Sequence, residues 1–160
     1  PGRPHRGLLP SFLFDTSQAK TFYVLKAWLL TFIPRVVLGV IVTGLAPQAP
    51  MPEFGGTGLA VYLLLILFAP VVGTFVMVPP LLLLNRFFGE TAAIVGSALL
   101  WGLLHSYAVP IWGLIVWWPF LIFSTIIFAW RETSLATAMV LTIAVHAFQN
   151  GVPGWGLLVG

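Results

Sequence analysis

Two histidines and an asparagine lie inside stretches that hold few other polar side chains. His105 ends residues 101–105 (WGLLH), and His146 and Asn150 begin and end residues 146–150 (HAFQN). Imidazole exchanges protons near neutral pH, and an amide can stabilise an oxyanion. Polar and ionisable groups in apolar segments are costly, so by default they indicate a functional site. The chemistry these residues could support is general acid–base hydrolysis or ligand binding.

The spacing of these residues places them on two helical strips. Residues three or four apart share a face of an α-helix. One strip consists of Ser97, Trp101 and His105, and the other of Thr142, His146 and Asn150. Neither strip is suited to face lipid, so we expect the two strips to face each other.

The composition decides which elements carry the strips. The chain has 160 residues, of which 59% are hydrophobic and only 7% are charged, whereas soluble domains carry about a quarter charged residues. Residues 61–68 are apolar on every side, without the alternation of a membrane barrel. A backbone surrounded by lipid must satisfy its hydrogen bonds internally, and helices do so. We therefore expect an all-α, polytopic transmembrane helix bundle.

The sequence divides into a polar basic tail, residues 1–20, and a single transmembrane domain, residues 21–160. The domain is expected to contain about five spans, at residues 27–46, 59–84, 91–109, 112–130 and 134–150. A proline-rich loop, residues 46–58, separates the first two spans. Pro70, Pro79 and Pro80 should kink or break the second. Small residues four apart, Ala92/Gly96 and Ala98/Gly102, predict that the third span is central in the bundle.

The charged residues predict an orientation. In a five-span chain the basic tail residues, Arg86 and Arg131 fall on one side of the bilayer, and the loop containing Glu53 falls on the other. The positive-inside rule then places the N-terminus in the cytoplasm. The seven basic residues form no aromatic-interleaved patch, so nucleic acid is not an expected partner. The expected partners are the lipid bilayer and other membrane protein subunits.

Arg35 is the one basic residue in the middle of an expected span, directly after Pro34. A central arginine costs about 2.5–3.5 kcal/mol on insertion scales unless it is paired. One interpretation is that it binds carbonyls freed by Pro34. The other is a site for an anionic ligand or a lipid headgroup.

Three motifs in order resemble one known family. Residues 69–74 (APVVGT), 101–105 (WGLLH) and 146–150 (HAFQN) resemble the CPBP family of intramembrane proteases, also called Abi or type II CAAX prenyl protease-like. The resemblance covers about residues 60–150, and residues 85–89 (NRFFG) look like the family's turn after its first motif. It implies that His105, His146 and Asn150 are catalytic positions. In the family a Glu-Glu-x-x-x-Arg motif precedes them, and its first glutamate activates water.

The chain departs from the family in that first motif. Gly73 and Thr74 stand at the positions of the glutamate pair, and Val78 stands at the position of the arginine. A general base must be able to ionise within hydrogen-bond reach, which neither glycine nor threonine can do near neutral pH. Glu53 is the one acidic residue expected on the histidine side, and it would have to fold inward. Two histidines without a carboxylate fall short of a zinc ligand set, so no metal is expected.

Three functions remain open from the sequence. The first is an inactive family member, a pseudoenzyme that serves as scaffold or accessory subunit of a membrane complex and needs no cofactor. The second is an intramembrane endopeptidase with an atypical base. The third is a membrane subunit in which His105 or His146 is an axial ligand of haem or chlorophyll.

Overall fold

The computed structural model describes residues 7–159, which form an all-α bundle without strands. Its long helices are α1 (Lys20–Leu45), α3 (Ala69–Ala108), α4 (Trp112–Trp130) and α5 (Leu135–Gly154). The short elements are the 3-10 turn η2 (Ser11–Phe14), α2 (Leu59–Leu63), the π-helical turn η3 (Leu64–Phe68) and α6 (Gly156–Val159). The expected fold class, an all-α helical bundle, is confirmed.

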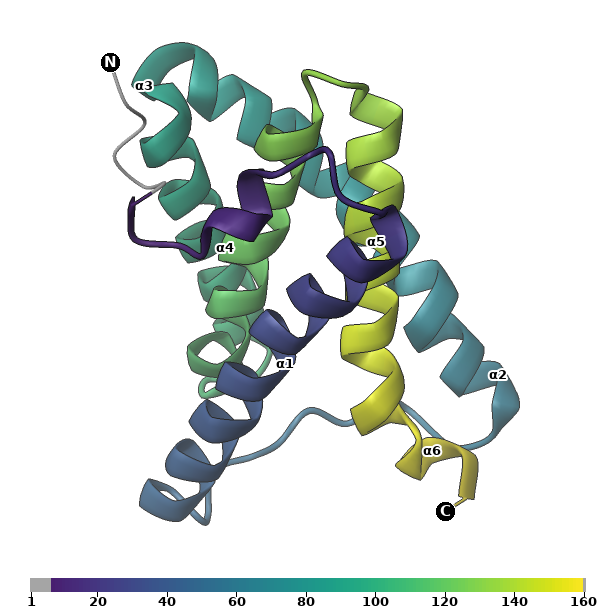
Figure 1. Ribbon diagram of the computed structural model, residues 1–160. Coiled ribbons are helices and arrows are strands. Elements are labelled where there is room, and N and C mark those ends of the chain that lie inside the picture. Colours follow the sequence, from purple (N-terminus) through teal and green to yellow (C-terminus); the bar gives the residue numbers. More distant parts are fainter. Residues whose placement is uncertain (1–6, 160) are drawn as a thin grey trace.

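Four helical stretches of the described chain are long and apolar enough to cross a membrane. One of them consists of two helical arms joined by a sharp turn. The stretch Leu59–Ala108 has 50 residues, about 75 Å at ~1.5 Å per residue and far more than a bilayer core of ~30 Å. It is interrupted at Gly89, whose φ of 81° lies in the region that favours glycine. Figure 1 shows the chain turning back there, so the bundle has five long arms.

The interruption of this stretch differs in detail from the expectation. The π-helical turn η3 ends at Phe68, two residues before Pro70, but α3 continues through Pro79 and Pro80. The reversal occurs at Gly89, five residues beyond the expected end of the second span. A single glycine therefore turns the chain where the sequence suggested a longer connection.

The central helix is α4 rather than the second arm of α3. Thirteen of its 19 residues are buried, whereas the second arm of α3 buries five, namely Ala93, Ile94, Ser97, Ala98 and Gly102. The prediction that residues 91–109 are central is therefore wrong. The small residues do mediate close packing, since a β-carbon on Gly102 would lie 3.3 Å from Cβ of Trp117 in α4. They bring the helix close to its neighbour without placing it in the middle.

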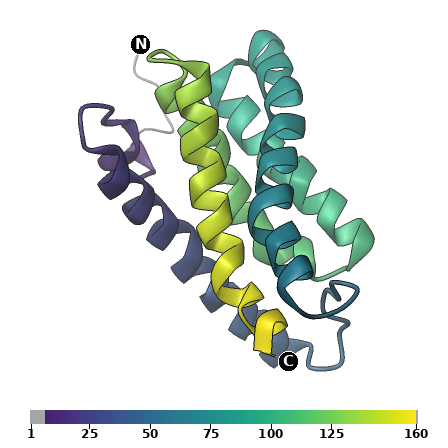
Figure 2. The ribbon, with the colours of Figure 1, turned by 90° about the vertical axis from the view of Figure 1, so that its right-hand side faces the viewer.

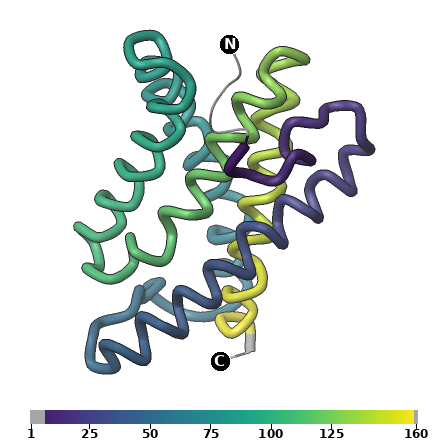
Figure 3. Tube along the Cα trace, turned by 60° about the vertical axis from the view of Figure 1, so that its left-hand side comes forward, coloured from purple at the N-terminus to yellow at the C-terminus, as the bar shows by residue number. Residues whose placement is uncertain are grey.

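The remaining helices surround α4. Figure 3 shows α1 running diagonally across α4 and α5, and Figure 2 shows α5 between α1 and the first arm of α3. One end of the bundle, here called the Gly89 end, holds the Gly89 turn, the start of α1 and the α4–α5 connection. The other, here called the proline-loop end, holds residues 46–58 and α6, and Gly58 N–H donates to Leu157 O there.

The observed bundle includes residues before the first expected span and after the end of the last one. Residues 11–14 pack onto it, because Leu13 is fully buried and accepts a hydrogen bond from the Tyr23 hydroxyl through its carbonyl at 3.1 Å. Helix α5 continues four residues past the expected end at Asn150. The tail residues Arg3, His5 and Arg6 lie outside the described residues.

Two prolines free carbonyls that receive side-chain donors from neighbouring helices. Pro34 has no N–H for the carbonyl of Leu30, four residues earlier, and Trp118 Nε1 of α4 donates to that carbonyl at 2.8 Å. Pro153 likewise leaves the carbonyl of Gln149 without its usual donor, and Arg35 Nη1 supplies one at 2.9 Å. Arg35 thus binds a carbonyl freed by Pro153, not by Pro34 as the sequence suggested.

A third freed carbonyl results from the π-helical turn. The N–H of Ala69 donates to Leu64 O, five residues earlier, in the π register. In the same register the next residue, Pro70, would donate to Leu65 O, but proline has no N–H. Asn150 Nδ2 of α5 donates to Leu65 O at 3.1 Å. These three bonds connect α1, α4, α5 and η3 where lipid provides no alternative partner.

Candidate functional site

His146 lies half-buried against aromatic rings of α4 and against a glycine of α3. Its ring stacks on Phe123 with centroids 4.8 Å apart and planes inclined by 30°. A β-carbon built on Gly73 would lie 3.4 Å from Cε1 and 3.9 Å from Nδ1 of this imidazole. Gly73 therefore faces His146 directly. A β-carbon at position 73 would therefore touch the ring at van der Waals distance.

His105 lies near the end of the second arm of α3, and its tautomer is fixed. Its Nδ1 is 2.7 Å from the carbonyl oxygen of Trp101. A carbonyl only accepts, so Nδ1 carries a proton, and in the neutral form of the ring Nε2 is then an acceptor. The ring meets Trp112 edge-on, with centroids 4.8 Å apart. His105 is therefore oriented by its own helix and by the start of α4.

Phe120 of α4 contacts both histidines. Its ring centroid is 5.2 Å from that of His105 and 6.2 Å from that of His146. We call Gly73, His105, Phe120, Phe123 and His146 the histidine pocket. Helices α3, α4 and α5 each contribute to it, and α4 supplies its aromatic wall.

The rest of the two polar strips does not meet in this pocket. Ser97 accepts a hydrogen bond of 3.0 Å from Ser124 of α4, and Thr142 donates back to Ala138 O of its own helix. The expectation that the strips face each other is therefore wrong beyond the histidines. The central position of α4 is the reason, because its side chains come between α3 and α5.

Asn150 lies one turn beyond His146 but serves another contact. Its amide nitrogen donates to Leu65 O of η3, so one of its two N–H donors is engaged with the backbone. Trp101, in contrast, stays with the pocket, because its ring stacks on Phe120 with centroids 5.3 Å apart. Of the three expected catalytic positions, the structure brings His105 and His146 together through Phe120 and directs the Asn150 amide toward η3.

The other two positions of the altered first motif are buried. The Thr74 side chain is 1% exposed, and its hydroxyl has no hydrogen-bond partner among the described residues. Val78 belongs to the hydrophobic core. An arginine at position 78 would thus enter an apolar interior. Only position 73 opens directly onto His146.

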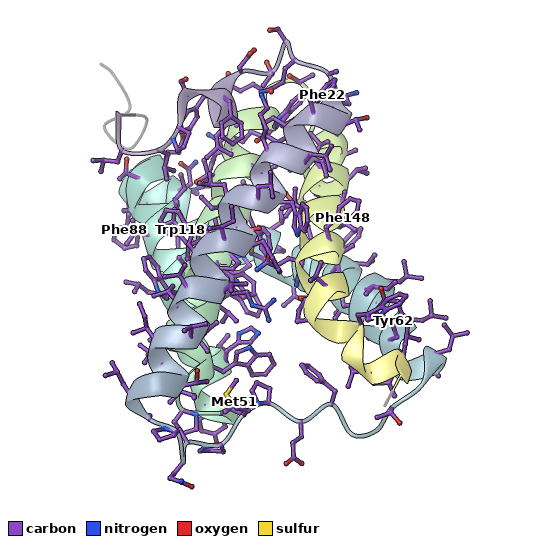
Figure 4. The ribbon with its side chains drawn as sticks, turned by 60° about the horizontal axis from the view of Figure 1, so that its bottom comes forward. Phe22, Met51, Tyr62, Phe88, Trp118 and Phe148 are labelled. Atoms are coloured by element: carbon purple, nitrogen blue, oxygen red, sulfur yellow. The ribbon has the colours of Figure 1, made fainter. Side chains whose placement is uncertain are left out.

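Acidic side chains lie elsewhere. Glu53 is exposed in the proline-rich loop, and Figure 4 shows the Met51 side chain of that loop pointing toward the helices. Within residues 7–159 no three His, Asp or Glu side chains gather as a metal site would require. The histidine pocket therefore presents imidazole and aromatic groups without a carboxylate.

Sequence reasoning missed Gln149, Trp118 and Phe120. Gln149 and Trp118 take part in the hydrogen bonds to carbonyls that prolines leave without a donor. The positions of Pro153 and Pro34, each four residues after such a carbonyl, could have indicated these bonds. Phe120 had no such signal, since an aromatic residue in an apolar helix is ordinary.

Comparisons of the chain with protein-family models, with curated proteins and with solved structures find no match.

Proposed function

We propose that this chain is a multi-pass integral membrane protein, a degenerate CPBP-like pseudoenzyme, that serves as a non-catalytic subunit of a larger membrane complex. One observation carries the proposal: Gly73, the position of the family's first glutamate, faces His146 without a side chain. This contact supports the interpretation of an acid–base site that has lost its acid.

Without that acid the pocket lacks a group to activate water. A general base has to reach the proton it takes at about 2.6–3.2 Å, directly or through one water. His105 Nε2 remains an acceptor, but a neutral imidazole alone is a weak substitute for a carboxylate–histidine pair. The Asn150 amide nitrogen is engaged with Leu65 O. These contacts support an inactive pocket.

The exposed half of α1 supports the subunit role. The buried residues of α1 are Tyr23, Val24, Ala27 and Thr31, and none after Thr31 is buried. The remaining residues up to Leu45 extend away from the other helices at the lower left of Figure 1. An apolar arm with so few contacts inside the chain leaves a helix surface for neighbouring membrane subunits.

We expect the protein to leave its native membrane in mild detergent as part of an assembly much larger than its own 17.4 kDa. Size-exclusion chromatography with light scattering, corrected for bound detergent, measures this mass. A protein that migrates as a solitary monomer, while a known complex in the same extract stays intact, would contradict the subunit role.

The charge distribution supports a cytoplasmic N-terminus. Lys20, Arg86 and Arg131 lie toward the Gly89 end, whereas the charged residue of the proline-rich loop is Glu53. Positive residues accumulate on the cytoplasmic side. The proposed topology therefore places the Gly89 end in the cytoplasm and the proline-loop end on the opposite side.

Single cysteines test this orientation, because the chain contains none of its own. In intact cells a membrane-impermeant maleimide should label Gln48→Cys at once and Thr133→Cys only after permeabilisation. Both positions are exposed, so accessibility within the fold is matched. The reverse labelling pattern would invert the proposed topology.

The two alternative functions have less support. For an axial ligand role, a flat macrocycle would need open space beside His105 or His146, but both rings are in contact with aromatic side chains. The two surface grooves are lined by neither histidine. For an endopeptidase, the base would have to be the uncharged His105 or an acid from the exposed loop.

Hydrolysis is the direct test of the inactive pocket. We expect the purified protein in nanodiscs to leave fluorogenic membrane peptides intact, at the rate of empty discs. His146→Ala and His105→Ala should then change nothing. Turnover that either substitution abolishes would establish the endopeptidase instead.

A further inference from the structure

Arg35 is a cation within α1, a helix long and apolar enough to cross a membrane, and no side chain of the described residues supplies its counter-charge. It lies ten residues before the end of α1 at Leu45, about 15 Å along the helix. Its side chain is half-buried, and Nη1 donates to Gln149 O. A guanidinium has five N–H donors, and the others find no partner among the described residues. A charge held at this depth is costly unless it is paired.

Within residues 7–159, no side-chain carboxylate supplies the pair. The chain has four acidic residues, and all of them are among the described residues. Glu90 forms an ion pair of 3.5 Å with Arg131. Glu132 follows Arg131 in the α4–α5 connection, and Glu53 is exposed in the proline-rich loop.

Asp15, the fourth acid, is held at the Gly89 end. Its carboxylate accepts from the hydroxyl and the N–H of Ser17, and these bonds lower its pKa below the ordinary value. Asp15 is therefore charged at neutral pH but engaged outside the helices. No described side chain balances Arg35, which leaves its spare donors for an anion from another molecule.

Gln149 connects Arg35 to the packing of α1 against α5. Its side chain is 2% exposed, its amide lies 2.9 Å from Thr31 Oγ1, and its Nε2 is covered by protein atoms. The spare donors of Arg35, not this amide, are therefore the groups left for an anion.

Arg35 lies in the seam between α1 and α5. It donates to the Gln149 carbonyl, and the Gln149 side chain contacts Thr31, which lies one turn before Arg35 in α1. Figure 4 shows Phe148 of α5 and Trp118 of α4 on either side of α1, so aromatic residues flank this helix. Gln149 is five residues before the end of α5, about 7.5 Å from it. The headgroup region of a bilayer is within reach.

We infer that Arg35 binds a phosphate oxyanion between α1 and α5, supplied by the headgroup of an anionic phospholipid or by free phosphate. The planar guanidinium forms parallel hydrogen bonds to phosphate oxygens. This site goes beyond the proposed subunit function and does not depend on the histidine pocket being inactive.

The test compares nanodiscs of phosphatidylcholine alone with discs that contain phosphatidylglycerol, and adds inorganic phosphate to the neutral discs. Thermal unfolding and native mass spectrometry report the bound anion. Arg35→Met by itself would leave Gln149 O without a donor. The decisive variant is therefore Arg35→Met with Pro153→Ala, which restores an N–H for that carbonyl, compared with Pro153→Ala as reference.

We expect the wild-type protein and Pro153→Ala to retain the anion and the double variant to bind it about tenfold more weakly, the loss typical of a charge-assisted hydrogen bond. Arg86→Met, which removes an exposed cation at the Gly89 end, is the matched control and should bind as wild type. A response to phosphatidylglycerol alone identifies the headgroup, and a response to inorganic phosphate identifies the free ion. No response to either, equal binding by the double variant, or an equal loss in Arg86→Met would overturn the inference.

Discussion

Replacing Gly113 by leucine is expected to destabilise the protein by about 3 kcal/mol, because steric overpacking at a backbone contact has no cheap relaxation. Gly113 is the second residue of α4. A β-carbon there would collide with the carbonyl of Gly102 in α3 and with the hydroxyl of Ser106. The helices would have to separate at the point where His105 and Trp112 meet. Gly113→Ala should already lose most of this stability, because the collision occurs at the β-carbon.

The free energy of unfolding in mixed micelles, followed by circular dichroism during detergent titration, measures this effect. Gly39→Leu is the matched control, because nothing lies within 4 Å of a β-carbon at Gly39 in α1. Its effect should stay within about 0.5 kcal/mol of wild type. Equal stabilities of the Gly113 and Gly39 variants would show that α3 and α4 do not pack through this contact.

Asn150→Leu is expected to cost about 1–2 kcal/mol, because the Leu65 carbonyl would then lose its donor in a medium without water. The same substitution should cost much less in a Pro70→Ala background. Alanine at position 70 restores an N–H that can reach Leu65 O within the helix. The coupling between the two positions should be about 1 kcal/mol in a double-mutant cycle.

Thr43→Val serves as the control for this cycle, since the Thr43 hydroxyl donates back to Gly39 O of its own helix on an exposed face. Its cost should be near zero and independent of Pro70. If Asn150→Leu costs the same with and without Pro70, then Asn150 does not act by satisfying the freed carbonyl.

The sequence predicted the helical fold because lipid and composition leave few alternatives. Apolar runs of span length, closed by Pro110 and by Arg131-Glu132, place α4 within a residue of where it lies. The turn at Gly89 and the central position of α4 were not predictable in the same way. The turn depends on the positive φ of Gly89, which the sequence does not determine. The burial of α4 depends on contacts that form only when the helices assemble.

The candidate site was predictable in its residues but not in its contacts. The spacing of His105 and His146 brought both histidines to the same end, and the structure places Gly73 opposite His146. The hydrogen-bond partner of the Asn150 amide could not be predicted, because it depends on the register of the π-helical turn. Arg35 shows the same limit: proline positions reveal which carbonyls are free, but only the fold reveals which side chain reaches each of them.

The most direct measurement of the central claim is peptide hydrolysis by three purified proteins in the same nanodiscs: wild type, Gly73→Glu and the uncharged isostere Gly73→Gln. A glutamate at position 73 would bring a carboxylate to the imidazole of His146, which lies 3.4 Å from the expected β-carbon. We expect background rates for wild type and Gly73→Gln, and an increase for Gly73→Glu of about a hundredfold, the contribution of a general base. Hydrolysis by the wild-type protein that His146→Ala abolishes would contradict this expectation.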